Sequence, residues 1–191
     1  MKKYLQSTEF IDWKDTDVQR KAQMLSKGMS TDEQIAETCF LFVRDEIKHS
    51  VDFQLNPLTA KASDVLKYKT GYCYAKSHLL AALLRACNIP AGLCYQRLTI
   101  ANNKAPFCLH GLNAVYLQKY GWYRIDSRGN KSGVDAGFCP PTEQLAFSVA
   151  SKGECNIEGI WPTPLPIVIN ALKSNSTWVT MYENLPDIEI Y

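Results

Sequence analysis

The sequence predicts an α+β fold, in which helices come first along the chain and an antiparallel sheet follows. Two stretches before residue 50 carry apolar residues at helical spacing, and a third stretch, rich in alanine and leucine, begins at Cys73. Three strand-like stretches follow Pro90, and a short turn joins the last two. Helices and antiparallel strands that are segregated along the chain indicate the α+β class.

The first two helices are predicted on either side of Gly28. Residues 15–27 carry apolar side chains at helical spacing and stop at this glycine. The second helix is expected to begin with a capping box of Ser30 and Glu33, and its apolar stripe extends to Ile47. These helices are expected to form part of the scaffold that surrounds the third.

The third long helix is expected to be central. A short helical turn capped by Ser63 precedes it, and a polar loop then leads through Gly71 to Cys73. The helix ends before Pro90, because a proline disfavours the helical conformation of the residue before it. Its apolar residues lie on more than one side, which favours a helix covered by other elements.

The second half of the chain is expected to form the sheet. The predicted strands cover residues 93–100, 109–117 and 122–126. Residues 118–121 form the hairpin turn between the last two strands. Further along, the proline-rich residues 161–166 predict a stiff extended segment, and strands are expected near 167–169 and 178–182.

Composition and charge exclude several classes of function. The 191 residues are 46% hydrophobic and 21% charged, as in a globular protein, so one domain over residues 1–191 is expected. Lysine plus arginine exceeds aspartate plus glutamate by only two, 21 against 19, and the charges are scattered. Nucleic acid is therefore not an expected partner. A membrane is not an expected partner either, because no stretch approaches the roughly eighteen apolar residues that a membrane span needs.

The cysteines predict a reducing environment. There are seven of them, an odd number without paired spacing, and no apolar run follows the N-terminal lysines as in an export signal. We therefore expect a cytoplasmic protein. Structural roles are expected for the cysteines that lie on apolar stripes, in a strand or in loops, which are Cys39, Cys87, Cys94, Cys139 and Cys155.

Three residues suggest a nucleophile, its base and the group that orients the base: Cys73, His110 and Asp126. Cys73 lies in the first turn of its helix, where unpaired backbone N–H groups stabilise a thiolate. His110 and Asp126 lie on successive strands of one hairpin, which brings them together. The backbone N–H of Cys73 can also stabilise an oxyanion, whereas the sequence identifies no second donor.

Each of these residues also has a structural interpretation. A free cysteine is most often a small buried hydrophobe, a strand histidine is commonly a hydrogen-bonded core residue, and Asp126 fits a turn at a strand end. Cys108 and His110 form half of a metal site, and His49 and His78 are not spaced to complete it. No metal is therefore expected.

Three blocks of the sequence resemble the signature segments of the transglutaminase-like superfamily, a branch of the papain-like fold. They are GYCYAKSHLLAALLRACNIPA, LHGLNAVYL and GWYRIDSRGN. The resemblance covers residues 31–130, and it predicts no structure for the extension at 150–191. It implies a core in which the nucleophile helix packs on an antiparallel sheet. It also implies that Cys73 is the nucleophile, His110 the general base and acid, and Asp126 the orienting carboxylate.

The resemblance further implies acyl transfer through a thioester, without a cofactor. The thiolate attacks an amide carbonyl of a peptide or protein, an amine or ammonia leaves, and water or a second amine releases the acyl group. The family usually has alanine and tryptophan after the histidine, where this chain has Gly111 and Leu112. Tyr72, Tyr74 and Trp122 are therefore expected to supply the aromatic surface that binds substrate.

Three hypotheses of function follow. The first is a cytoplasmic cysteine hydrolase or acyltransferase that acts on an amide in a peptide or protein, with hydrolysis favoured over cross-linking. The second is a catalytically silent module that keeps the fold and binds peptides or proteins, with residues 161–166 lying across its groove. The third is a metal-dependent or redox-sensing protein built on Cys73, Cys108 and His110.

Overall fold

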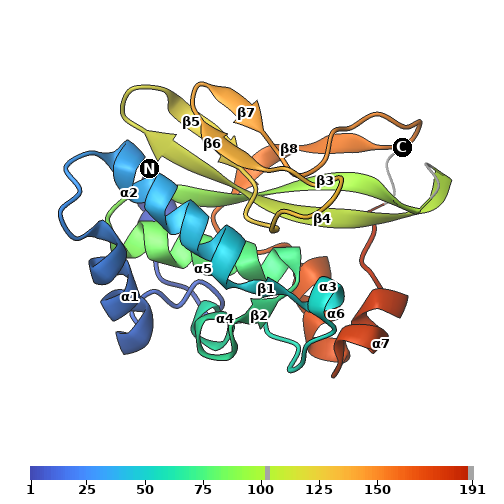
Figure 1. Cartoon of the computed structure of the whole chain (residues 1–191). Helices are drawn as coiled ribbons and strands as arrows, with labels where there is room; N and C mark the ends of the chain where they lie inside the picture. Colours follow the sequence, from blue (N-terminus) through green and yellow to red (C-terminus); the bar gives the residue numbers. More distant parts are fainter. Residues whose placement is uncertain (102–103, 189–191) are drawn as a thin grey trace.

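The computed structural model describes residues 1–101 and 104–188, in which a sheet lies on a group of helices (Figure 1). The helices are η1 (Lys2–Leu5), α1 (Thr16–Ser26), α2 (Asp32–Leu41), the π-helical turn η2 (Phe42–Glu46), α3 (Ser50–Phe53), α4 (Ala62–Tyr68), α5 (Cys73–Ala86), α6 (Pro166–Ser174) and α7 (Trp178–Glu183). The strands are β1 (Lys48–His49), β2 (Thr70–Gly71), β3 (Ala91–Ala101), β4 (Lys104–Leu117), β5 (Gly121–Ile125), β6 (Gly137–Cys139), β7 (Thr142–Gln144) and β8 (Cys155–Trp161). Across the described residues, no helix is both long and apolar enough to cross a membrane.

The main sheet has the strand order β5-β4-β3-β8, and every neighbouring pair is antiparallel. Strand β5 pairs only with the second half of β4, from Asn113 to Leu117. The first half of β4 therefore has no strand beside it on that edge within the described residues. The N-terminus of α5 and the C-terminal segment approach β4 there, since Gly111 N–H reaches Cys73 and Leu109 N–H donates to the carbonyl of Pro186.

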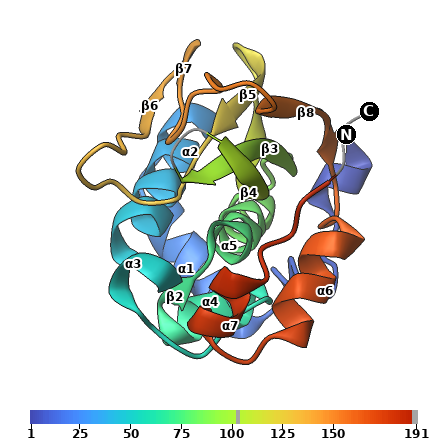
Figure 2. The ribbon, with the colours of Figure 1, turned by 90° about the vertical axis from the view of Figure 1, so that its right-hand side faces the viewer.

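Helix α5 occupies the centre of the molecule, as the sequence predicts. Every residue from Cys73 to Arg85 is buried, with the sheet on one side and the other helices around it (Figure 2). The chain leaves the helix through Asn88, which has a left-handed φ of 58° one residue before Ile89-Pro90. Burial on all sides explains why the apolar residues of this helix do not form a single stripe. The α+β class is confirmed.

A short parallel ladder ties two distant segments together near the start of α5. Strand β1 pairs with β2, and the register sets His49 opposite Gly71. Thr70 strengthens this ladder, because its hydroxyl donates to the carbonyl of Lys48 at 3.1 Å. The segment that contains His49 is therefore held beside the chain that enters α5 at Cys73.

Two predicted helix starts are wrong. Helix α2 begins with a capping box of Thr31 and Gln34, one residue later than expected, because two overlapping boxes occur in the sequence. Ser63 does not cap α4, which follows Lys61. The Ser63 hydroxyl and N–H instead donate to the carboxylate of Asp12, at 2.6 and 3.0 Å.

The strands predicted in the C-terminal part are also wrong, because residues 166–174 and 178–183 form helices α6 and α7. Pro166 starts α6, a position where the fixed φ of proline suits a helix. The α6 residues that face the core, Val168, Ile169 and Leu172, follow helical spacing. Strand β8, at the edge of the sheet, was not predicted, and residues 189–191 of the expected extension lie outside the described residues.

Candidate active site

Cys73 is the first residue of α5, and its side chain faces the edge of β4. Cys73 is 7% exposed, and Gly111 N–H donates to Sγ at a distance of 3.4 Å. A Cβ at position 111 would lie 3.0 Å from Cδ1 and 3.1 Å from Cα of Tyr74, so a larger residue would require Tyr74 to shift by a few tenths of an ångström. Gly111 therefore lies where β4 and the start of α5 pack closely.

His110 and Asp126 meet beside this cysteine. His110 Nε2 lies 2.7 Å from Asp126 Oδ2. Ile125, the last residue of β5, pairs with Asn113 of β4. Asp126 follows it directly and therefore leaves β5 beside β4, the strand that carries His110. The Asp126 carboxylate is fully buried, and it accepts backbone N–H groups from Arg128 and Ala146, each at 3.1 Å.

The surroundings favour an imidazolium at position 110. Burial alone would lower the pKa of His110, but the Asp126 carboxylate and the Cys73 side chain together raise it to about 10. Burial would raise the pKa of Asp126, but His110 and the two backbone N–H groups hold it below its ordinary value. Because Nε2 is engaged with Asp126, Nδ1 is the ring nitrogen left for Cys73. The three predicted residues are thus brought together.

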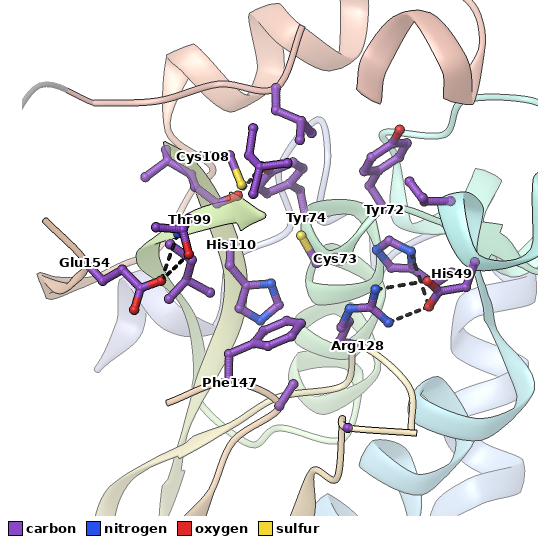
Figure 3. A pocket seen from close by; sticks show the side chains of 18 of the residues that line it. His49, Tyr72, Cys73, Tyr74, Thr99, Cys108, His110, Arg128, Phe147 and Glu154 are labelled. Atoms are coloured by element: carbon purple, nitrogen blue, oxygen red, sulfur yellow. Dashed lines mark hydrogen bonds and ion pairs between the residues drawn. The ribbon is translucent and has the colours of Figure 1, made fainter. Parts of the chain in front are cut away.

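Phe147 packs against the imidazole of His110. Its ring meets the His110 ring edge to face, with centroids 5.0 Å apart and planes at 89° (Figure 3). The residue before it, Ala146, donates the N–H that Asp126 accepts. A single loop segment therefore orients the carboxylate and limits the access of water to the imidazole.

Cys73 and His110 line a pocket of about 640 Å³, whereas Asp126 lies buried behind His110. Tyr72 and Tyr74, both expected at the substrate site, line it (Figure 3). Their hydroxyls donate to the carbonyls of Trp178 and Leu109, and burial raises the pKa of both. Both residues are almost fully buried and their hydroxyls are already paired, so their expected role in binding substrate stays a prediction.

Trp122, the third expected aromatic residue, does not belong to this pocket. It pairs across the sheet with Tyr116 and packs edge to face on the rings of Tyr116 and Tyr4. Tyr116 lies six residues along β4 from His110, which corresponds to about 20 Å of strand. The expectation for Trp122 is wrong because the distance along the strand separates it from the site.

A charged cluster forms the wall across from His110. The Arg128 guanidinium binds the Asp52 carboxylate with two hydrogen bonds, and Lys131 Nζ contacts the same carboxylate at 2.6 Å. Burial would raise the pKa of Asp52, but Arg128 and Lys131 hold it well below its ordinary value. His49 completes the cluster, with Nδ1 3.8 Å from Asp52 Oδ2.

The C-terminal segment borders the pocket on another side. Tyr182 and Leu185 line it, and Asp187 fixes this segment to β3 through two hydrogen bonds from Arg97. The proline-rich residues 161–166, expected to lie across the groove, are not among the lining residues. Leu165, in that segment, instead donates its N–H to the Tyr95 hydroxyl.

Cys108 also lines the pocket, where burial raises the pKa of its thiol to about 12. Within residues 1–101 and 104–188, no three histidine, cysteine or acidic side chains are arranged to hold a metal ion. Cys108 and His110 thus share a pocket wall without forming part of a larger ligand set among these residues.

Sequence comparison identifies the family. The profile of the transglutaminase-like superfamily matches residues 19–127, more than half of the chain, and this range includes all three candidate catalytic residues. The chain belongs to the transglutaminase-like superfamily. Among curated proteins, no sequence matches this one.

Solved structures agree in fold. A candidate cysteine protease from Cytophaga hutchinsonii superimposes with a TM-score of 0.52 at 18% identity, covering 65% of this chain and 40% of the other. The periplasmic domain of TgpA from Pseudomonas aeruginosa gives a TM-score of 0.48 at 17% identity, covering 65% of this chain and 45% of the other. This chain therefore spans less than half the length of either protein. The first likeness supports the fold of a transglutaminase-like protein.

The sequence analysis did not identify most of the lining residues as part of the site. Three of them, Arg128, His49 and Phe147, differ in how far the sequence reveals them. Arg128 follows Asp126 by two positions, the spacing at which an aspartate side chain accepts a backbone N–H. The sequence could therefore have shown that Arg128 lies next to Asp126. His49 and Phe147 carry no such signal. Only the tertiary structure brings the short ladder at His49 and the loop at Phe147 to the pocket.

Proposed function

We propose that this protein is a cysteine-dependent acyltransferase that acts on an amide carbonyl of a peptide or protein, and that hydrolysis is its main reaction. The observation that carries the proposal is the convergence of Cys73 with a tightly bonded His110–Asp126 pair. Nε2 lies 2.7 Å from Oδ2, and β4 contacts Sγ through Gly111 N–H. Membership of the transglutaminase-like superfamily supports the same chemistry.

The geometry supports a sequence of balanced steps. The Cys73 thiolate attacks the carbonyl carbon, and the protonated His110 gives its proton to the leaving amine as the carbon–nitrogen bond breaks. A thioester remains on Sγ. Neutral His110 then takes a proton from water, and the hydroxide releases the acyl group as a carboxylic acid. Asp126 keeps the imidazole oriented throughout and stabilises its charged form.

Hydrolysis is favoured over cross-linking on a simple argument. Water needs no binding site of its own, whereas transfer to an amine requires the same pocket to hold a second substrate. The pocket of about 640 Å³ is within the range of a single small-molecule or peptide side-chain site. We also propose a cytoplasmic location, which the odd number of cysteines supports.

The reactivity of Cys73 tests the proposal. Purified protein is treated with limiting iodoacetamide near neutral pH, and the labelled peptides are quantified by mass spectrometry. Cys139, which is exposed, provides an internal reference for ordinary thiol reactivity. We expect Cys73 to react faster than Cys139 in spite of its burial, and we expect His110→Ala to remove this advantage. Equal rates in the wild-type protein would favour the catalytically silent module.

A second measurement separates hydrolysis from cross-linking. The protein is incubated with casein and a fluorescent primary amine, and the release of ammonia or new peptide ends is compared with the incorporation of the amine. Hydrolysis predicts release with little incorporation, and Cys73→Ala should abolish both. Each amine that is incorporated also expels one leaving amine, so incorporation that accounts for nearly all of the release would identify an amine as the natural acceptor.

A further inference from the structure

His49 lies across Cys73 from His110 and has no role in the steps described above. It belongs to β1, and its partner in the parallel ladder is Gly71, two residues before the nucleophile. The side chain is more than nine-tenths buried, yet its ring lines the pocket. Figure 3 shows Cys73 between the two histidines.

The ring nitrogens of His49 have no hydrogen-bond partner among the described residues. Nδ1 is buried without a hydrogen bond, because Asp52 Oδ2 remains 3.8 Å away. The Asp52 oxygens are engaged by Arg128 and Lys131 instead. Nε2 is not among the buried unpaired atoms, and no hydrogen bond engages it within the described residues. It therefore opens to the pocket.

The surroundings keep His49 neutral. Burial lowers its pKa well below the ordinary value, Arg128 adds to this effect, and Lys76 and His110 contribute in the same direction. Asp52 is the one group that opposes them. The Tyr72 ring, with its centroid 5.6 Å from that of His49, packs against the imidazole. The neutral ring has one N–H, and Asp52 is too far to hold it on Nδ1.

The proposed acyl transfer requires two donors for the oxygen of the tetrahedral intermediate. The leaving amine must face His110 to receive its proton, so the oxygen must point elsewhere. The Cys73 N–H, in the first turn of α5, is unpaired within the helix and supplies one donor. The side of Cys73 away from His110 carries the unpaired imidazole of His49.

We propose that His49 is the second donor of the oxyanion hole and donates its Nε2–H to the developing oxyanion. This inference rests on the acyl transfer proposed above. It assigns a catalytic role to a residue outside the Cys73, His110 and Asp126 group. It also explains why the chain keeps a buried histidine beside an aspartate that is already paired.

The test compares two reactions of the same sulfur. Acylation by p-nitrophenyl acetate passes through a tetrahedral oxyanion, as Sγ bonds to the carbonyl carbon and p-nitrophenolate leaves. Alkylation by iodoacetamide displaces iodide and forms no oxyanion. Both rates are measured in the full-length wild type, in His49→Ala and in His49→Gln, whose side-chain amide N–H reaches about as far as Nε2.

We expect His49→Ala to lower the rate of acylation by about 10-fold to 100-fold, and to leave alkylation of Cys73 within about twofold of the wild type. His49→Gln should recover part of the acylation rate, because it restores an N–H donor. The alkylation rate serves as the control for folding and for the ionisation of Cys73.

Two results would overturn the assignment. An equal loss in acylation and alkylation would show that His49 only supports the fold, and unchanged acylation in His49→Ala would show that it is not a donor. If wild-type Cys73 alkylates rapidly but forms no acyl-enzyme with the ester, the oxyanion hole itself is refuted. If it is also no more reactive than Cys139, the proposed function fails as well.

Discussion

The pocket contains two buried histidines, each beside an aspartate, and their pKa values are shifted in opposite directions. His110 is 2.7 Å from Asp126, and its pKa is raised to about 10. His49 is 3.8 Å from Asp52, and its pKa is lowered well below the ordinary value. Burial lowers the pKa of both, so burial does not account for the difference.

The difference between the two pKa shifts comes from the other groups that bind each carboxylate. Among the described residues, the other hydrogen bonds to the Asp126 carboxylate come from backbone N–H groups, which carry no net charge. Its negative charge raises the pKa of His110, and it also acts on the more distant Lys76. Asp52 is bound by Arg128 and Lys131, and the positive charge of Arg128 also lowers the pKa of His49. In this pocket, the aspartate that raises the pKa of its histidine is the one to which no lysine or arginine side chain is hydrogen-bonded among the described residues.

The largest effect is expected from Asp126→Asn. An amide cannot stabilise the imidazolium, so the pKa of His110 should fall, and the acylation of Cys73 should slow by about 10³-fold or more. The pH profile of Cys73 alkylation by iodoacetamide should shift together with the pKa of His110, since the wild-type profile depends on the charge of His110. An unchanged profile would show that Asp126 does not raise the pKa of His110.

His78 provides the reference for a buried histidine that no carboxylate contacts by a hydrogen bond among the described residues, since Asp12 acts on it only through its charge. It lies inside α5 with Nδ1 2.7 Å from the carbonyl of Ala60, and burial lowers its pKa to about 4. Between pH 6.5 and 4 the unfolded chain binds this proton more readily than the folded chain. Stability should therefore fall as the pH falls through this window, by about 3 kcal/mol in all for this group.

The measurement is urea unfolding at several pH values from 7 to 4, in the wild type and in His78→Leu. The difference between the two curves isolates this group from the carboxylates and from His49. We expect the variant to lose less stability on acidification. Parallel curves would show that the pKa of His78 is not lowered by its burial.

Arg128→Met tests the role of competing cations directly. Removal of the guanidinium frees an Asp52 oxygen for His49 and removes a positive charge from its surroundings, so the pKa of His49 should rise by about one unit or more. The chain has only three histidines, so NMR titration can follow each ring. Lys131→Met is the matched control, because Lys131 is about half exposed and does not contribute to the lowered pKa of His49. A larger shift in that control would refute the assignment to Arg128.

The smallest effect is expected at the aromatic residues. Phe147→Ala opens the His110 ring to water, which weakens its interaction with Asp126, and should slow acylation of Cys73 by several-fold, up to about 10-fold. Trp122→Ala should leave this rate within about twofold, because Trp122 packs on Tyr4 and Tyr116 far along the sheet. Equal losses in both variants would indicate a general disturbance of the sheet.

Much of the fold and the candidate catalytic group could be predicted from the sequence. The helix at Cys73, the strands that follow Pro90 and the turn before Gly121 each have a local pattern, and the structure confirms them. The convergence of His110 with Asp126 followed from the hairpin between them, because a tight turn leaves little choice of partners. The catalytic roles of these residues stay a prediction.

Other parts could not be predicted, for reasons that are also physical. Residues 167–169 and 178–182 are short apolar runs rich in β-branched and aromatic residues, which suit a strand or a buried helix equally. Packing of their apolar residues against the core favours the helical conformation of α6 and α7.

The prediction that Trp122 belongs to the substrate site was wrong for a different reason. Alternation along a strand sets the face on which a side chain lies, but not its distance from the site.

The sequence by itself determined the central helix, the strands that follow Pro90, the family and the convergence of three side chains, because local periodicity, short motifs and tight turns carry that information. Only the tertiary structure decided what surrounds them. The neutral state of His49, the cover of Phe147 and the wall formed by Tyr182 and Leu185 all depend on contacts between segments far apart in the chain. Charge and burial at a site are sums over such neighbours, and no local pattern records them.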